Sequence, residues 1–183
     1  MNPPSRGWTY EQLKDVDFPF EWDLIDGVVT PRPRTDFWHD QVRDSLMITL
    51  RNTRSGIFSV LGPVTALLDE RNLLRPDAVV FDRTTPGLAE SEFLPIGSVA
   101  LVAEVVLPST RANDRFRKPG QYAEKGIPYY WRVERGLDNL PIVHEFHRDD
   151  EKGVYLPVAQ HEGVLRTSVP YPVEIDLAAL VEL

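Results

Sequence analysis

The most apolar run in the chain covers residues 99–107, and Glu104 is its one charged residue. Near-continuous apolar character is typical of a strand that is covered on both faces of a sheet. We therefore predict that residues 99–107 form the central strand. A carboxylate buried in such a strand is costly unless it is paired or binds a cation, so Glu104 requires a partner.

Two amphipathic helices are predicted around this strand. Between residues 36 and 54, apolar residues recur every four positions with charged residues between them, which indicates a helix packed on a core. These apolar residues are Trp38, Val42, Leu46 and Leu50. A second helix is predicted over residues 111–125, followed by Gly126, a residue favoured just after a helix end. Pro119 lacks an N–H group and should interrupt that helix near Lys118.

Short apolar stretches bounded by turn-forming residues predict the remaining strands. They cover residues 22–25, 28–30, 57–61, 64–68, 78–81, 129–134, 142–147 and 154–160. The dipeptide Asp26-Gly27 joins the first two and is favoured in tight type I′ hairpins. Short helices are expected at residues 9–16 and 175–183, and residues 82–97 are rich in turn formers. The pattern predicts one α/β domain over residues 1–183 with an N-terminal hairpin.

The amino-acid composition limits the kinds of metal site and active site that the chain can form. The chain has no cysteine, which excludes disulfides, thiolate zinc sites and cysteine nucleophiles, so any metal must be held by oxygen or imidazole. No segment near the start has the apolar run of a signal peptide, and none approaches the ~20 apolar residues that cross a bilayer. A cytoplasmic protein with no membrane partner is therefore expected.

The charge distribution is uneven. The net charge is −8, which counts against simple phosphate binding, because nucleic-acid affinity depends on Lys and Arg contacts. Residues 111–135, however, contain seven basic and three acidic residues, a local balance of +4. This segment is a candidate for contact with nucleic acid, and the alternative is an ordinary solvated helix face.

Two acidic residues stand out against apolar strands. Asp77 directly precedes the predicted strand at residues 78–81, and Glu104 follows 27 positions later inside the central strand. If these strands are neighbours, the two carboxylates converge. Such a pair suits Mg²⁺ or Mn²⁺, which bind a few protein oxygens and leave the remaining positions to water and a phosphate. A nearby lysine would stabilise the charge that develops in the transition state.

The order Pro76-Asp77 and then Glu104-Val105-Val106 resembles the PD-(D/E)XK nuclease motif, with Val106 at the position of the lysine. The wider pattern resembles the Uma-type family of restriction endonucleases within that superfamily. In that family the lysine lies on the following helix, and Lys118 is the matching residue here. Leu107 stands where the family usually has serine, and Asp23 where it usually has glutamate. The remaining landmarks are Leu24-Ile25-Asp26-Gly27, His39, Arg75, Pro108-Ser109-Thr110, Asn113-Asp114, Tyr122, Gly126-Ile127-Pro128 and Tyr130-Trp131.

This resemblance implies a restriction-endonuclease-like fold, in which helices flank a mixed β-sheet core, and Mg²⁺-dependent hydrolysis of DNA phosphodiester bonds. Asp77 and Glu104 would hold the metal, and Lys118 would complete the catalytic set. Asp23 and His39 are possible auxiliary residues, although His39 at a helix start also suits a packing or capping role. The resemblance further implies a homodimer. Two alternatives are a decayed nuclease fold that acts as a binding or scaffold module, and a nuclease for RNA or branched DNA.

Each catalytic candidate also has a purely structural interpretation. Asp77 suits a strand-end carboxylate that accepts hydrogen bonds from backbone N–H groups. Glu104 suits a buried ion pair with Arg111 or Arg132. A lone lysine on a helix, such as Lys118, is usually solvated. The structure can distinguish these interpretations, because they differ in burial and in the partner of each side chain.

Overall fold

The computed structural model describes residues 4–182. Its centre is a six-stranded mixed sheet with the order β10-β9-β8-β7-β6-β3, in which β7 and β8 run parallel and the other neighbours run antiparallel. The strands are β3 (Phe58–Leu61), β6 (Ala78–Asp82), β7 (Val99–Val105), β8 (Tyr129–Arg135), β9 (Pro141–Asp149) and β10 (Val154–His161). The predicted mixed α/β architecture is confirmed, and the most apolar run is an interior strand.

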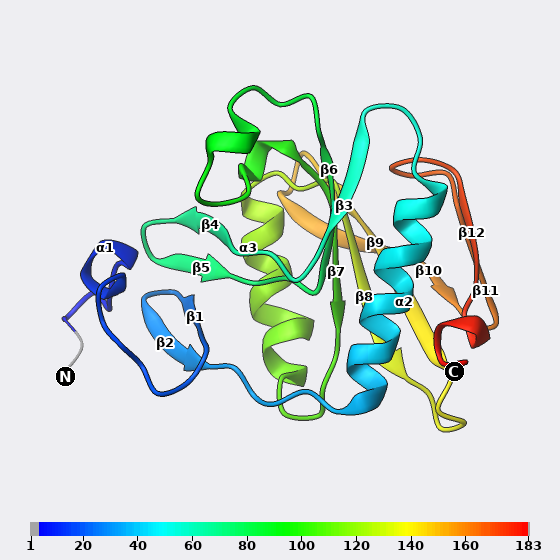
Figure 1. Cartoon of the computed structure of the whole chain (residues 1–183), viewed down its shortest axis with the longest axis horizontal. Coiled ribbons are helices and arrows are strands. Elements are labelled where there is room, and N and C mark those ends of the chain that lie inside the picture. Colours follow the sequence, from blue (N-terminus) through cyan, green and yellow to red (C-terminus); the bar gives the residue numbers. More distant parts are fainter. Residues whose placement is uncertain (1–3, 183) are drawn as a thin grey trace.

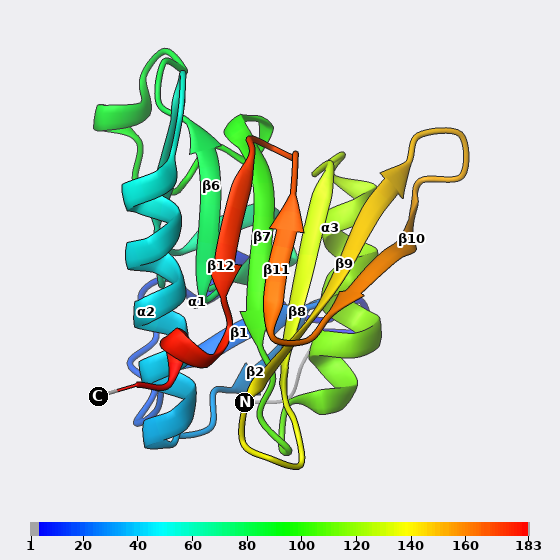
Figure 2. The same cartoon turned by 90° about the vertical axis from the view of Figure 1, so that its right-hand side faces the viewer.

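One helix covers each face of this sheet (Figures 1 and 2). The long helix α2 (Phe37–Thr53) packs on one face through the four apolar residues that its sequence spacing singled out. The short helix α3 (Lys118–Glu124) packs on the other face, where its Tyr122 meets Val102 of β7. Because side chains alternate along a strand, Ala103 faces α2 and Glu104 faces α3.

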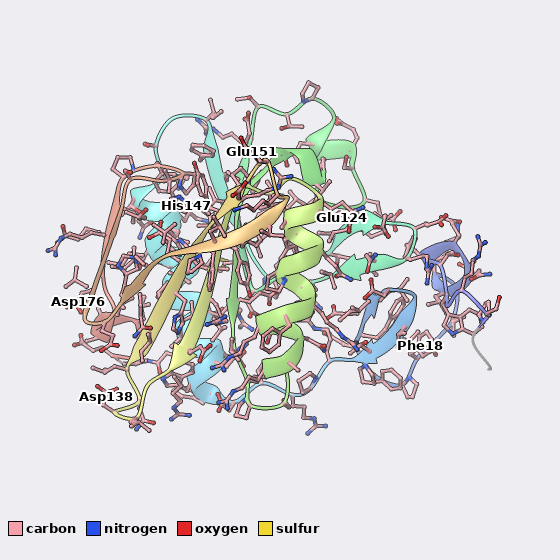
Figure 3. All side chains as sticks on the ribbon, turned by 180° about the vertical axis from the view of Figure 1, so that it is seen from behind. Phe18, Glu124, Asp138, His147, Glu151 and Asp176 are labelled. Atoms are coloured by element: carbon pink, nitrogen blue, oxygen red, sulfur yellow. The ribbon has the colours of Figure 1, made fainter. Side chains whose placement is uncertain are left out.

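A second, four-stranded antiparallel sheet lies beside α3, as the view from behind shows (Figure 3). Its order is β2-β1-β5-β4, with β1 (Trp22–Ile25), β2 (Val28–Pro31), β4 (Ala66–Asp69) and β5 (Asn72–Leu74). The predicted hairpin joins β1 and β2. Asp26 and Gly27 both have positive φ, 53° and 75°, as a type I′ turn requires.

The helix predicted over residues 111–125 is divided. Residues Asn113–Arg117 form a π-helical turn, η3, and α3 follows from Lys118. Pro119 cannot donate the hydrogen bond that a regular helix needs at this point, which accounts for the irregular turn. Gly126 follows the helix with φ of 81°. The interruption near Lys118 and the helix end before Gly126 therefore lie where the sequence predicts them.

The prediction of a helix over residues 175–183 is wrong for its first part. Ile175 lies in strand β12 (Val173–Asp176), which pairs with β11 (Val164–Thr167), a strand that the sequence did not indicate. Val173 and Ile175 are buried while Glu174 and Asp176 are exposed, which is the period of two of a strand rather than the period of a helix. Only Ala178–Leu180 forms a 3₁₀ turn, and residue 183 lies outside the described residues.

The remaining helical segments are short. They are α1 (Tyr10–Leu13) and the 3₁₀ turns η1 (Leu88–Glu90) and η2 (Ile96–Ser98), the last two inside the predicted turn-rich stretch. Among residues 4–182, no helix has both the length and the apolar character needed to span a membrane.

Candidate functional site

The register between β6 and β7 places Asp77 opposite Glu104. Ala78 pairs with Ala103 in this antiparallel ladder, so the next position along each strand brings Asp77 and Glu104 together. The backbone N–H of Val105 donates to Asp77 Oδ2 at 2.8 Å and fixes the carboxylate beside the strand. The predicted neighbourhood of the two acidic residues is therefore present in the structure.

Gly62, just after β3, allows the chain to pass close to Asp77. A Cβ atom built on Gly62 would lie 2.0 Å from the carbonyl oxygen of Asp77, far inside contact distance. Only glycine fits this approach without a backbone shift. The position of Asp77 thus depends on close packing between β3 and the start of β6.

Glu104 is 2% exposed and has two partners on α3. Its Oε2 lies 3.1 Å from Lys118 Nζ, and its Oε1 accepts a hydrogen bond of 2.7 Å from the Tyr122 hydroxyl. The alternative partner Arg132 instead pairs with Glu134 at 2.6 Å. Lys118 is itself buried, so the interpretation of a solvated helix lysine is wrong.

Asp114 joins this group, although we did not select it from the sequence as a site residue. It is 2% exposed, and its Oδ1 lies 2.8 Å from Lys118 Nζ. Asp114, Lys118 and Tyr122 follow one another at intervals of four residues, the spacing that places side chains on one helix face. Asp114 and Tyr122 are both landmarks of the family resemblance, and this spacing predicts that they share a helix face with Lys118.

The two auxiliary candidates also reach the site. His39, in the first turn of α2, has its Nε2 3.4 Å from Asp77 Oδ2. Asp23 on β1 is buried and pairs with Arg32 Nη1 at 2.9 Å. Arg32 also donates to the backbone carbonyl of Arg75. No sequence pattern singled out Arg32, because its role depends on how the hairpin packs against the central sheet.

Seven of these side chains, without Tyr122, line one small cavity of about 40 Å³. They comprise four buried carboxylates, two permanent cations and His39, a balance of −2 when all four carboxylates are ionised and His39 is neutral. The carboxylates are Asp23, Asp77, Glu104 and Asp114, and the cations are Arg32 and Lys118. Uncompensated charge is expensive to bury, so ionisation of all four carboxylates favours a bound divalent cation.

The pKa values of Asp77 and Glu104 are shifted in opposite directions. Burial, together with the negative charges of Asp114 and Asp77, raises the pKa of Glu104 to about 8 despite the opposing effect of Lys118. Burial also acts to raise the pKa of Asp77, but the hydrogen bond and charge of His39, the charge of Lys118 and the hydrogen bond from Val105 together outweigh burial, and the pKa is lowered. Asp77 is therefore ionised at neutral pH, while Glu104 retains a proton in much of the population.

The neighbouring carboxylates also shift the pKa of Lys118. Burial alone would lower its pKa, but Glu104 and Asp114 outweigh burial and raise it. The ammonium form persists throughout the physiological range. A permanent positive charge therefore lies beside the carboxylate pair.

The donor set suits a hard cation that is only partly ligated by protein. Among residues 4–182, no cluster of three or more His, Asp or Glu side chains is arranged to hold a metal by itself. Mg²⁺ commonly takes one or two carboxylates and completes its shell with water and substrate phosphate. Asp77 and Glu104, opposite each other beside a cavity with room for a water molecule or two, match this requirement.

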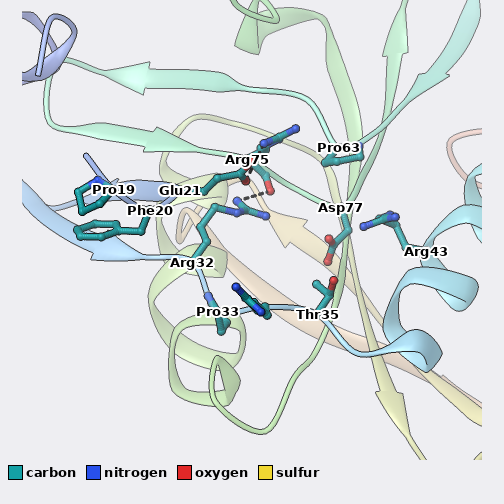
Figure 4. A pocket seen from close by; sticks show the side chains of 11 residues that line it. Pro19, Phe20, Glu21, Arg32, Pro33, Thr35, Arg43, Pro63, Arg75 and Asp77 are labelled. Atoms are coloured by element: carbon teal, nitrogen blue, oxygen red, sulfur yellow. Dashed lines mark hydrogen bonds and ion pairs between the residues drawn. The ribbon is translucent and has the colours of Figure 1, made fainter. Parts of the chain in front are cut away.

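A larger cleft of about 670 Å³ opens on Asp77 (Figure 4). Its lining includes Arg32, Arg34, Arg43 and Arg75. Figure 4 shows Asp77 between Arg32 and Arg43, below Pro63. Three of the four arginines are in ion pairs, Arg32 with Asp23, Arg43 with Asp40 and Asp44, and Arg75 with Glu21, so the positive charge at the entrance to the carboxylate site is partly offset.

The basic segment at residues 111–135 does not provide this positive surface. Five of its seven basic side chains are in ion pairs, so most of its positive charge is already partnered, and contact between this segment and nucleic acid stays a prediction. The pairs are Arg115 and Arg132 with Glu134, Lys118 with Glu104 and Asp114, Lys125 with Asp69, and Arg135 with Asp36. Of the acidic partners, Glu104, Asp69 and Asp36 lie outside the segment, so tertiary packing offsets part of its +4 balance.

The fold and the site define an α/β protein of the nuclease-like class. Residues 9–180 match the model of the Uma2 family, described as "Putative restriction endonuclease". The chain belongs to this family, as its sequence landmarks predicted.

Among solved structures, the chain is similar to the crystal structure of a putative nuclease belonging to DUF820 from Anabaena variabilis ATCC 29413. The TM-score is 0.71 at 13% sequence identity, over 94% of this chain and 96% of that chain. At this identity the similarity supports the fold. No curated protein matches the sequence.

Replacing Lys118 by Gln should destabilise the fold by about 3 kcal/mol, because Glu104 and Asp114 would remain buried without their counter-charge. Urea unfolding at neutral pH in EDTA measures this change. Lys152→Gln is the control, since Lys152 pairs with Asp149 at the surface with a side chain 66% exposed, and it should leave the midpoint nearly unchanged. Equal midpoints for the two variants would contradict the buried network.

Proposed function

We propose that this protein is a Mg²⁺-dependent endonuclease that hydrolyses DNA phosphodiester bonds, with Mn²⁺ as a substitute metal. The observation that carries the proposal is the buried deficit of permanent cations, two against four carboxylates, around Asp77 and Glu104 at the base of an arginine-lined cleft. The deficit suits a divalent cation, and the cleft suits a phosphate backbone. Membership of the Uma2 family supports the same reaction class.

Each side chain has a distinct part in the proposed reaction. Asp77 and Glu104 would hold the cation, which when bound lowers the pKa of water and neutralises charge on the phosphoryl group. The Lys118 ammonium would stabilise the negative charge that develops on the phosphate oxygens. His39 holds the Asp77 carboxylate in place from α2, and the cleft arginines would bind the flanking phosphates.

The alternative is a nuclease fold that has lost catalysis and serves as a binding module. Lys118 already contacts both Glu104 and Asp114, a closed arrangement that is stable without metal. Val106 at the motif lysine position also favours this alternative. The two functions differ in whether the carboxylate pair binds a divalent cation in a saturable way.

Asp77→Asn and Glu104→Gln should each reduce Mg²⁺-dependent cleavage by about a hundredfold or more, because each removes a charge that the transition state requires. Supercoiled plasmid and single-stranded circular DNA are the substrates. Glu174→Gln is the matched control and should retain full activity, since Glu174 on β12 forms an exposed ion pair with Arg166 on β11. Cleavage that persists unchanged in the two site variants would refute the assignment.

Mg²⁺ binding should strengthen with pH until about 8, the pKa of Glu104, and level off above it. Below that pH the cation must displace the Glu104 proton, so affinity should rise by about tenfold per pH unit. Titration calorimetry in two buffers of different ionisation enthalpy measures both affinity and released protons. A decayed site would show no saturable heat, and pH-independent binding would contradict the role of Glu104.

We also propose that the protein is a homodimer in the cytoplasm. Nucleases of this fold often pair so that two sites face two strands, and we expect the same here by analogy. Sedimentation equilibrium should then give twice the chain mass of 20.9 kDa. A mass that stays at one chain across the concentration range would exclude the dimer.

A further inference from the structure

The arginine-lined cleft also has an apolar wall. Pro19, Phe20 and Pro33 line the same space as the four arginines and Asp77. In Figure 4, Phe20 and Pro19 lie at one end of the cleft, Asp77 lies at the other, and Arg32 lies between them. Charge alone would suffice for binding a phosphate backbone, so the apolar wall calls for a separate explanation.

The Phe20 ring is partly exposed and packs against a neighbouring aromatic ring. Its side chain is 41% exposed, and its ring lies 5.6 Å from that of Phe18, which in turn lies 5.3 Å from Trp22. The aromatic row supports Phe20 from one side while leaving much of it open. Such a ring can receive a flat partner without reorganisation, which lowers the entropic cost of binding.

We infer that this cleft binds an unpaired DNA strand, whose bases stack on Phe20 while its backbone runs past Arg32 to Asp77. This inference rests on the proposed function and adds the structure of the substrate. A positively charged groove with an aromatic ring beside it is the arrangement by which proteins hold single strands, because every base offers a flat face for stacking.

The dimensions favour an unpaired strand over a duplex. The inner cavity of about 40 Å³ has room for a water molecule or two, so the scissile phosphate must lie in the outer cleft beside Asp77. In a duplex the faces of the bases are covered by their neighbours, and Phe20 would then have no partner. An unpaired nucleotide can place its phosphate at Asp77 and its base towards Phe20 in the same cleft.

One chain supplies every part of this site. The segment before β1 provides Phe20, the segment after β2 provides Arg32 and Pro33, α2 provides Arg43, and the start of β6 provides Asp77. Strand binding at this site therefore does not depend on a second copy.

The test is fluorescence anisotropy in EDTA, with a labelled oligonucleotide free or annealed to its complement. The wild type should bind the single strand about tenfold more tightly than the duplex, and Phe20→Ala should weaken single-strand binding by about tenfold while leaving duplex binding unchanged. Phe20→Trp should retain the preference. Phe116→Ala, at a ring 76% exposed on η3 outside the cleft, is the matched control and should change neither affinity.

Equal affinity for both forms, or equal weakening of both by Phe20→Ala, would overturn the inference. Because EDTA removes the metal, this result is independent of catalysis. Single-strand binding that depends on Phe20, combined with no cleavage in Mg²⁺, would support the inference and count against hydrolysis. Cleavage of the single strand at the same rate in the wild type and Phe20→Ala would support hydrolysis and count against the inference.

Discussion

The interaction on which the site depends is the contact of one buried ammonium, Lys118, with two buried carboxylates, Glu104 and Asp114. One positive charge cannot balance both, and Asp77 and Asp23 add two further carboxylates to the same cavity against the single charge of Arg32. The interior thus keeps a negative excess, which the protein relieves by holding a proton on Glu104. A cation that binds at this site would replace the proton on Glu104.

The fold sustains this costly arrangement because its parts come from rigid and separate elements. Two neighbouring strands, β6 and β7, fix the separation of Asp77 and Glu104 through their register. The irregular turn before α3 brings Asp114 and Lys118 over the sheet, and α2 adds His39 from the opposite side. Sites built on strands and helices hold their geometry more precisely than sites on loops. The cleft arginines, in contrast, come partly from loops, where a moving substrate must be accommodated.

The sequence predicted the parts of the site that follow from local rules. A charged residue in an apolar strand and a Pro-Asp pair at the start of its neighbour selected Glu104 and Asp77, and Asp26-Gly27 predicted the hairpin. Lys118 was selected only by the resemblance to the Uma-type family. The sequence did not predict the source of positive charge at the cleft. Ion pairs such as Lys125 with Asp69 join residues far apart in the chain, so a local charge count cannot show which cations remain available.

The central claim is that the buried charge deficit is filled by one divalent cation. Diffraction from crystals soaked in Mn²⁺, recorded at a wavelength where manganese scatters anomalously, tests it most directly. The account predicts one anomalous peak between the carboxylates of Asp77 and Glu104, with the Lys118 ammonium displaced towards Asp114. A crystal that takes up manganese elsewhere, while the Lys118 to Glu104 contact stays at its distance of 3.1 Å, would contradict the account.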